Sequence, residues 1–90
     1  MNKARRKELE KLAERMEELQ STISDIQEAL DSLKDEEQEY LDNMPENLQG
    51  SEKYDKAESA IESLESAYDT LQSMYDEASE VFDGINEACE

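Results

Sequence analysis

Residues 9–33 of this chain read LEKLAERMEELQSTISDIQEALDSL. Apolar side chains recur through this stretch at alternating steps of three and four residues. The same phase continues to the middle of the chain, with one polar member, at Leu9, Leu12, Met16, Leu19, Ile23, Ile26, Leu30, Leu33, Glu37, Tyr40 and Met44. Such spacing is typical of an α-helix that packs along its length against another helix.

A second run with the same spacing occupies the other half of the chain. Its members are Tyr54, Ala57, Ile61, Leu64, Tyr68, Leu71, Tyr75, Ala78, Phe82, Ile85 and Cys89. Between the two runs, Pro45 disfavours helical geometry in the residue before it, and Ser51 has a side chain suited to cap a new helix. We therefore expect helices over about residues 3–43 and 52–88, joined by a loop over 44–51.

The two runs together predict an all-α fold, a long antiparallel two-helix hairpin that forms a single domain over residues 1–90. If the chain reverses at the loop, apolar residues equally far from it face each other. This register pairs Leu33 with Ile61, Ile26 with Tyr68, and Leu19 with Tyr75. The aromatic residues of the runs are then core residues rather than a binding cage.

The first fifteen residues are basic, with six Lys and Arg against three Glu, whereas residues 16–90 hold three Lys against 23 acids. The register brings this segment to the end of the second helix. There it predicts ion pairs that neutralise two charge patterns unfavourable to the helix dipoles, between Arg5, Arg6, Lys7 and Asp83, Glu87, Glu90. A role in binding a partner is the alternative.

A further apolar row remains on the second helix after the hairpin is formed. It repeats every seven residues at Ala60, Ala67, Met74, Val81 and Ala88. A second apolar stripe on an otherwise polar helix indicates that another helix packs there. We expect a homodimer that completes an antiparallel four-helix bundle; the competing interpretation is that a different protein occupies the row.

Composition excludes several classes of function. The chain has no His, one Cys and a net charge of −17. The absence of His removes the commonest general base and metal ligand, and no catalytic or phosphate-binding motif is present, so we expect a protein that is not an enzyme and has no cofactor or metal. The charge speaks against direct binding of nucleic acid or anionic membranes and favours basic partners. With no transmembrane or signal segment, we expect a cytoplasmic protein.

The acidic residues include a regular row on the second helix, Asp55, Glu62, Asp69, Asp76 and Asp83. Acids at this spacing on a rigid helix could imitate a nucleic-acid backbone and occupy a basic groove. The hypothesis is therefore a non-enzymatic inhibitor that covers the basic surface of a nucleic-acid-handling or defence protein. The alternative is a self-associating structural module whose acidic surface serves only solubility.

The loop adds a resemblance. Residues 42–51 read DNMPENLQGS and are followed by Tyr54 and a helix rich in Leu, Ala and Glu. Over about residues 40–75, the sequence resembles small acidic helical proteins carried by phages and mobile elements of Gram-positive bacteria. The resemblance implies the cytoplasm of a bacterial host, where accessory phage proteins of this size are often non-enzymatic inhibitors of defence or host machinery. It assigns no functional residue.

Overall fold

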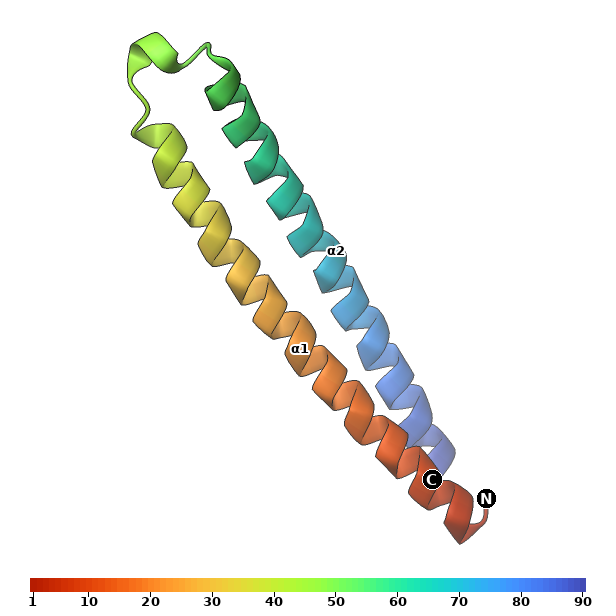
Figure 1. Cartoon of the computed structure of the whole chain (residues 1–90). Coiled ribbons are helices and arrows are strands. Elements are labelled where there is room, and N and C mark those ends of the chain that lie inside the picture. Colours follow the sequence, from red (N-terminus) through yellow and green to blue (C-terminus); the bar gives the residue numbers. More distant parts are fainter. The chain divides into compact units, whose positions relative to one another are not determined.

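The computed structural model describes all 90 residues and is all-α. Helix α1 spans Lys3–Asp42, a short 3₁₀ helix η1 spans Glu46–Leu48, and helix α2 spans Glu52–Cys89 (Figure 1). The predicted antiparallel hairpin of two long helices is confirmed. Helix α1 ends one residue earlier than expected and α2 one residue later.

Both long helices begin at a side-chain cap. The Asn2 side-chain oxygen accepts a hydrogen bond of 2.8 Å from the backbone N–H of Arg5. At the start of α2, Ser51 Oγ accepts one of 3.4 Å from the backbone N–H of Tyr54, as the sequence predicted. Glu52 and Asp55 follow in the first turn, where their negative charges favour the helix dipole.

The chain divides into two compact units. Unit 1 consists of Met1–Asp25 and Leu71–Glu90, and unit 2 of Ile26–Thr70. In each unit a segment of α1 lies beside a segment of α2 that runs in the opposite direction, and both chain termini belong to unit 1 (Figure 1).

The inner side of unit 1 combines small apolar residues with one polar clamp. Ala13, Ile23 and Ala78 are buried. The Gln20 amide donates hydrogen bonds to the backbone carbonyl of Tyr75, at 3.3 Å, and to Ser79 Oγ, at 2.9 Å. A partly buried amide is therefore satisfied from the opposite helix, which avoids the cost of an unpaired polar group.

Unit 2 has the same design next to the loop. Leu41, Ala57 and Ile61 form a buried cluster, against which Tyr54 packs. Gln27 is 6% exposed, and its amide donates a hydrogen bond of 3.3 Å to the backbone carbonyl of Tyr68. No large side chain is fully buried anywhere in the chain, so the core of the hairpin is thin.

The predicted register is wrong in one respect, the rotation of α1 about its own axis. Tyr68 meets Gln27 rather than Ile26, and Tyr75 meets Gln20 rather than Leu19. One expected seam row is instead 44–53% exposed, namely Leu12, Leu19, Ile26, Leu33 and Tyr40. The reason is that α1 has a second row that satisfies the same spacing, with one residue every seven: Ala13, Gln20, Gln27, Lys34 and Leu41.

The other predicted rows face inward. On α1 these are Leu9, Met16, Ile23, Leu30 and Glu37, and Met44 follows just beyond the end of the helix; all are buried or half-buried. On α2 the whole predicted run is buried or half-buried except Tyr68, which is 37% exposed. The rotation of α1 thus replaces the row of Ile26 with the row of Gln27 in the contact with α2 and keeps the row of Ile23 there.

The predicted ion pairs between the two ends of the chain are absent. The structure has three ion pairs, each within one helix: Lys11 with Glu8, Lys34 with Asp31, and Lys56 with Glu52. None involves Arg5, Arg6 or Lys7. An exposed ion pair stabilises a protein by at most about 1 kcal/mol. The conformational entropy lost when two long side chains are held in one geometry often costs more than this.

Two isoleucines three residues apart test the rotation of α1. Ile23 is 2% exposed and Ile26 is 44% exposed. We expect Ile23→Ala to lower the free energy of unfolding by about 2–4 kcal/mol, because it leaves a cavity. Ile26→Ala is the matched control and should cost less than about 1 kcal/mol. Both are measured by urea denaturation at the lowest practical protein concentration; equal or reversed costs would contradict the inward row.

Candidate protein-interaction faces

The acidic row lies on one side of α2. Its members repeat every seven residues, so each returns to nearly the same side of the helix. All five are exposed and none takes part in an ion pair: Asp55, Glu62, Asp69, Asp76 and Asp83. Asp76 accepts a hydrogen bond of 3.2 Å from the Gln72 amide, which leaves its charge intact. The row is therefore a line of negative charge that no cation in the chain neutralises.

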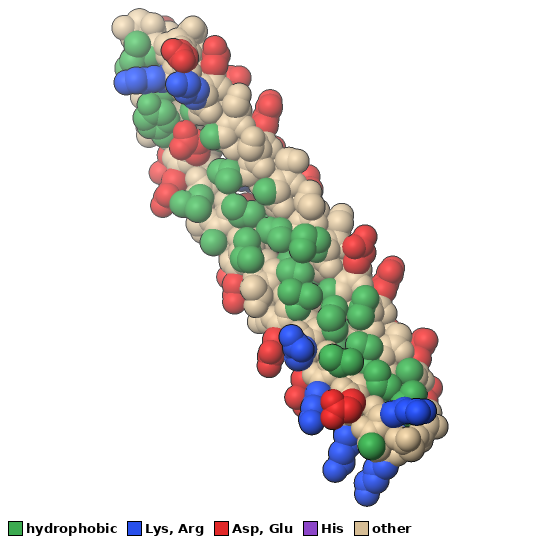
Figure 2. All heavy atoms as spheres, turned by 45° about the vertical axis from the view of Figure 1, so that its right-hand side comes forward, with side chains coloured by type: hydrophobic (Ala, Val, Ile, Leu, Met, Phe, Trp, Pro, Cys, Tyr) green, Lys and Arg blue, Asp and Glu red, His purple; other side chains and the backbone are tan.

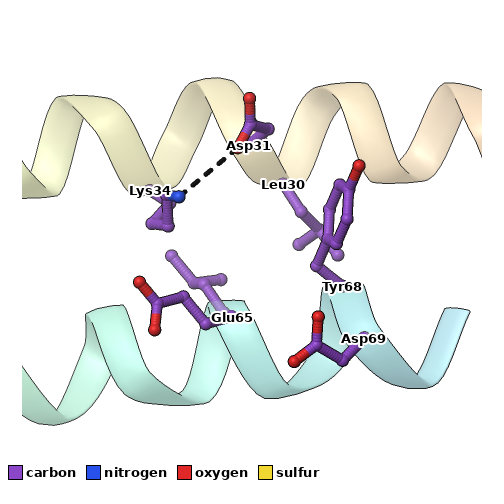
Figure 3. Close-up of a pocket in the computed structure, with 7 residues that line it drawn as sticks. Leu30, Asp31, Lys34, Glu65, Tyr68 and Asp69 are labelled. Carbon is purple, nitrogen blue, oxygen red and sulfur yellow. Dashed lines mark ion pairs between the residues drawn. The ribbon is translucent and has the colours of Figure 1, made fainter. Parts of the chain in front are cut away.

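An open hollow of about 370 Å³ lies beside this row in unit 2 (Figure 3). Leu30 and Tyr68 contribute apolar surface to it, and Asp31, Glu65 and Asp69 carry its negative charge. The one cation at the hollow is Lys34, whose ammonium lies 3.5 Å from Asp31. Three carboxylates against one ammonium leave the hollow electronegative and suited to a basic side chain.

A different face of unit 1 is apolar. Leu12 and Leu19 of α1 and Val81 of α2 are each close to half exposed. They line one groove of about 590 Å³ together with Met16 and Ile85. Exposed residues from both helices therefore meet in one groove of unit 1, which Arg15 and Glu18 also line.

Unit 2 carries an apolar face of the same kind. Tyr40 of α1 and Ala60 of α2 line a groove of about 480 Å³, with Lys53 and Lys56 at its edge. Ile26 and Leu33 belong to the same exposed row of α1 as Tyr40. Figure 2 shows hydrophobic side chains gathered on the face turned toward the viewer, with Asp and Glu side chains at its margins.

Two members of the predicted dimer row line these grooves, Val81 in unit 1 and Ala60 in unit 2. Met74 and Val81 are 46% and 50% exposed, Ala67 and Ala88 are exposed, and Ala60 is half-buried. The sequence assigned the exposed row of α1 to the hairpin seam because its spacing also fits that seam. The signal that could have revealed it is the pair Ala13 and Leu41, which marks a third apolar row on α1.

Three smaller features complete the surface. Cys89 is a free thiol, half-buried near the end of α2. No group of three or more His, Cys, Asp or Glu side chains is placed to hold a metal ion. Neither long helix has the uninterrupted apolar stretch that crossing a membrane requires.

No protein-family model, no curated protein and no solved structure matches this chain. The functional argument therefore depends on the faces described above.

Tyr54 is the one titratable group with a clearly shifted pKa. Its hydroxyl donates a hydrogen bond to the Glu58 carboxylate one turn later on α2, and this bond is the largest cause that raises the pKa of Tyr54 above its ordinary 10.0. Partial desolvation and the negative charges of Glu58, Asp42 and Asp55 raise the pKa further. All of these causes favour the neutral phenol.

We expect Glu58→Ala to lower the pKa of Tyr54, because it removes the hydrogen bond and one negative charge. Tyrosinate absorbance during an alkaline titration measures this, with Tyr54→Phe to identify the band and Glu62→Ala as the exposed control. Since the folded-state pKa is raised, the stabilisation is present below the ordinary pKa and is lost as pH rises through the raised one. An unchanged titration in Glu58→Ala would contradict the assignment.

Proposed function

We propose that this protein acts by binding other proteins and not by catalysis, as an acidic helical inhibitor in the bacterial cytoplasm. Its acidic side would cover the basic surface of a nucleic-acid-handling or defence protein. The observation that carries the proposal is the exposed row on α2 from Asp55 to Asp83, in which no member has an ion-pair partner. A basic surface would supply the cations that the chain itself does not.

To imitate nucleic acid, the protein would need a negative charge per unit length close to that of the duplex. Helix α2 has 38 residues and is therefore about 57 Å long. Duplex DNA of that length carries about 33 negative charges. One copy of this chain has a net charge of −17, about half as much. Two copies side by side would approach the density of the duplex, so mimicry is favoured by a dimer.

The charge-driven function predicts binding that depends on salt and on the acidic row. Capture of a basic partner from host lysate should weaken steeply as ionic strength rises, because the Debye length shrinks. The triple variant Glu62→Lys, Asp69→Lys, Asp76→Lys should lose the partner, as judged by mass spectrometry of the captured proteins.

A matched control changes the net charge equally at a different place. Glu14, Glu28 and Asp35 are exposed acids on one side of α1, separated by fourteen and seven residues, and their reversal to Lys alters the total charge by the same amount. We expect this control to retain more of the partner than the α2 triple. Equal loss from both triples would show that only net charge matters and would reject the row as the binding surface.

A second candidate function is a self-associating structural module whose acidic surface serves solubility. The specific observation in its favour is that each unit leaves apolar residues uncovered: Leu12, Leu19 and Val81 in unit 1, and Tyr40 in unit 2. Large exposed apolar surfaces on a helix generally mark contacts with another helix. A homodimer through these residues is compatible with either function.

Met74→Glu tests self-association through the predicted row. It introduces a charge at the centre of the apolar face and should convert a dimer to a monomer in sedimentation equilibrium. Ser73→Glu adds the same charge at the neighbouring exposed position and should leave the mass unchanged. A dimer that survives Met74→Glu would place the interface elsewhere.

A further inference from the structure

The basic segment, residues 1–15, has no ion-pair partner on the other helix. It carries six Lys and Arg in a chain whose net charge is −17. All six of these side chains are exposed, and one forms an ion pair, Lys11 with Glu8 one turn earlier. Because the predicted pairs with the end of α2 do not form, the alternative interpretation remains, namely that the segment binds a partner.

Four of these cations form a row along α1, the basic row. They occur at every fourth residue, at Lys3, Lys7, Lys11 and Arg15. Four residues correspond to about 6 Å along an α-helix and to a turn of about 40° past the starting side. The basic row is therefore an exposed line of positive charge about 18 Å long. All of it belongs to unit 1.

The surface of opposite charge is the acidic side of α2 within unit 2. Glu58 and Glu65 lie between members of the acidic row there, so five exposed acids fall within about 80° around the helix and about 21 Å along it. These acids, the acidic stripe, are Asp55, Glu58, Glu62, Glu65 and Asp69. None has an ion pair, and the two lysines of this stretch, Lys53 and Lys56, lie at least about 100° away around the helix.

The basic row and the acidic stripe match in length and in spacing. Both place like charges four residues apart, as at Lys3 and Lys7, and such pairs destabilise a helix. Glu58 and Glu62 do the same on α2. A second helix with charges of the other sign offsets this repulsion by attraction between the helices. Two helices side by side present their charges at the same rise per residue, so several pairs can form at once.

The hollow beside the acidic stripe has room for one incoming side chain (Figure 3). Its lining includes Leu30, Leu64, Glu65, Tyr68 and Asp69. The aliphatic stem of a lysine or arginine packs on such apolar surface while its charged end reaches a carboxylate, and the ring of Tyr68 attracts a cation. Lys34 already lines the hollow, with its side chain 29% exposed and its ammonium 3.5 Å from Asp31. The hollow is therefore suited to a second cation from outside the chain.

We propose that the basic row of one copy binds the acidic stripe of a second copy. This inference rests on the proposed function, which makes the acidic side of α2 the binding surface, and adds a competitor for that surface within the protein itself. A contact between two different surfaces is heterologous and can link more than two copies. A basic partner then has to displace the basic row before it binds.

Salt dependence provides the first test. At about 0.1 M salt, charges more than about 10 Å apart are screened, so the contacting pairs attract while most of the remaining acids of the two copies do not repel. The average mass in sedimentation equilibrium should therefore rise with protein concentration. At about 1 M salt the Debye length is about 3 Å, and the dissociation constant should rise at least about tenfold. Self-association that salt leaves unchanged would overturn the charged contact.

Charge reversal on each surface provides the second test. The basic-row variant is Lys3→Glu, Lys7→Glu, Lys11→Glu, and the acidic-stripe variant is Glu62→Lys, Glu65→Lys, Asp69→Lys. Each should raise the dissociation constant at least about tenfold, because attraction becomes repulsion. A chain with all six changes keeps the net charge of −17 and should recover self-association, since its two surfaces are exchanged. Stronger association of the acidic-stripe variant would show that net repulsion alone governs the mass, and would overturn the contact.

Mixing the two variants provides the third test, and circular dichroism confirms that both are helical. The basic-row variant keeps the acidic stripe, and the acidic-stripe variant keeps the basic row. The mixture therefore contains one complete contact and should form pairs that stop at two chains. Fluorescence anisotropy measures this with a label at Cys89 of the basic-row variant, which lies in unit 1 and so outside its remaining binding surface. Absence of binding between the two variants would overturn the proposal.

These measurements contain no host partner, so their failure is distinct from failure of the proposed function. If the mixed variants pair while capture from lysate fails, the contact between copies is supported without the proposed function. If capture succeeds while the mixed variants do not pair, the acidic side binds a partner without competition from the basic row, and this inference is overturned.

Discussion

The structure depends on the width of the apolar side of α1. Three adjacent rows of this helix carry apolar residues, and one partner helix covers only two of them. The row turned toward α2 contains Gln20 and Gln27, whose amides can be satisfied there by carbonyl and hydroxyl oxygens of α2. Leu19 and Ile26, which need no hydrogen bond, are left outside, where apolar burial is still available to a further chain.

The rotation of α1 gives the hairpin two chemically different sides. Ala60 and Glu62 are two positions apart on α2, which separates them by about 160° around the helix. Their rows keep this separation because both repeat every seven residues. A contact through the row of Ala60 would therefore leave the acidic row accessible, so the proposed self-association and the proposed binding of a basic partner would not compete for the same side of α2.

Features governed by local chemistry could be predicted from the sequence. The ends of both helices, the capping role of Ser51 and the inward run of α2 follow from residue types within a few positions of each other. The rotation of α1 could not, because Ile26 and Gln27 belong to rows that fit the 3-4 spacing equally well. The ion pairs expected of Arg5 and its neighbours also failed, since opposite charges at the same end of two helices are not thereby held in one geometry.

The remaining question is how a chain with a net charge of −17 could associate with itself. Repulsion between two copies depends on where the charges lie, and salt screens exposed charges separated by more than about 8–10 Å. Here the acidic row lies on another side of α2, and the charged residues that line the apolar groove of each unit are Arg15 and Glu18 in unit 1 and Lys53, Lys56 and Glu37 in unit 2. The grooves therefore carry three cations against two acids, so the total charge of the chain overstates the repulsion at these surfaces. Pairing of two copies would in turn raise the negative charge presented to a basic partner, so the apolar side would strengthen what the acidic side does.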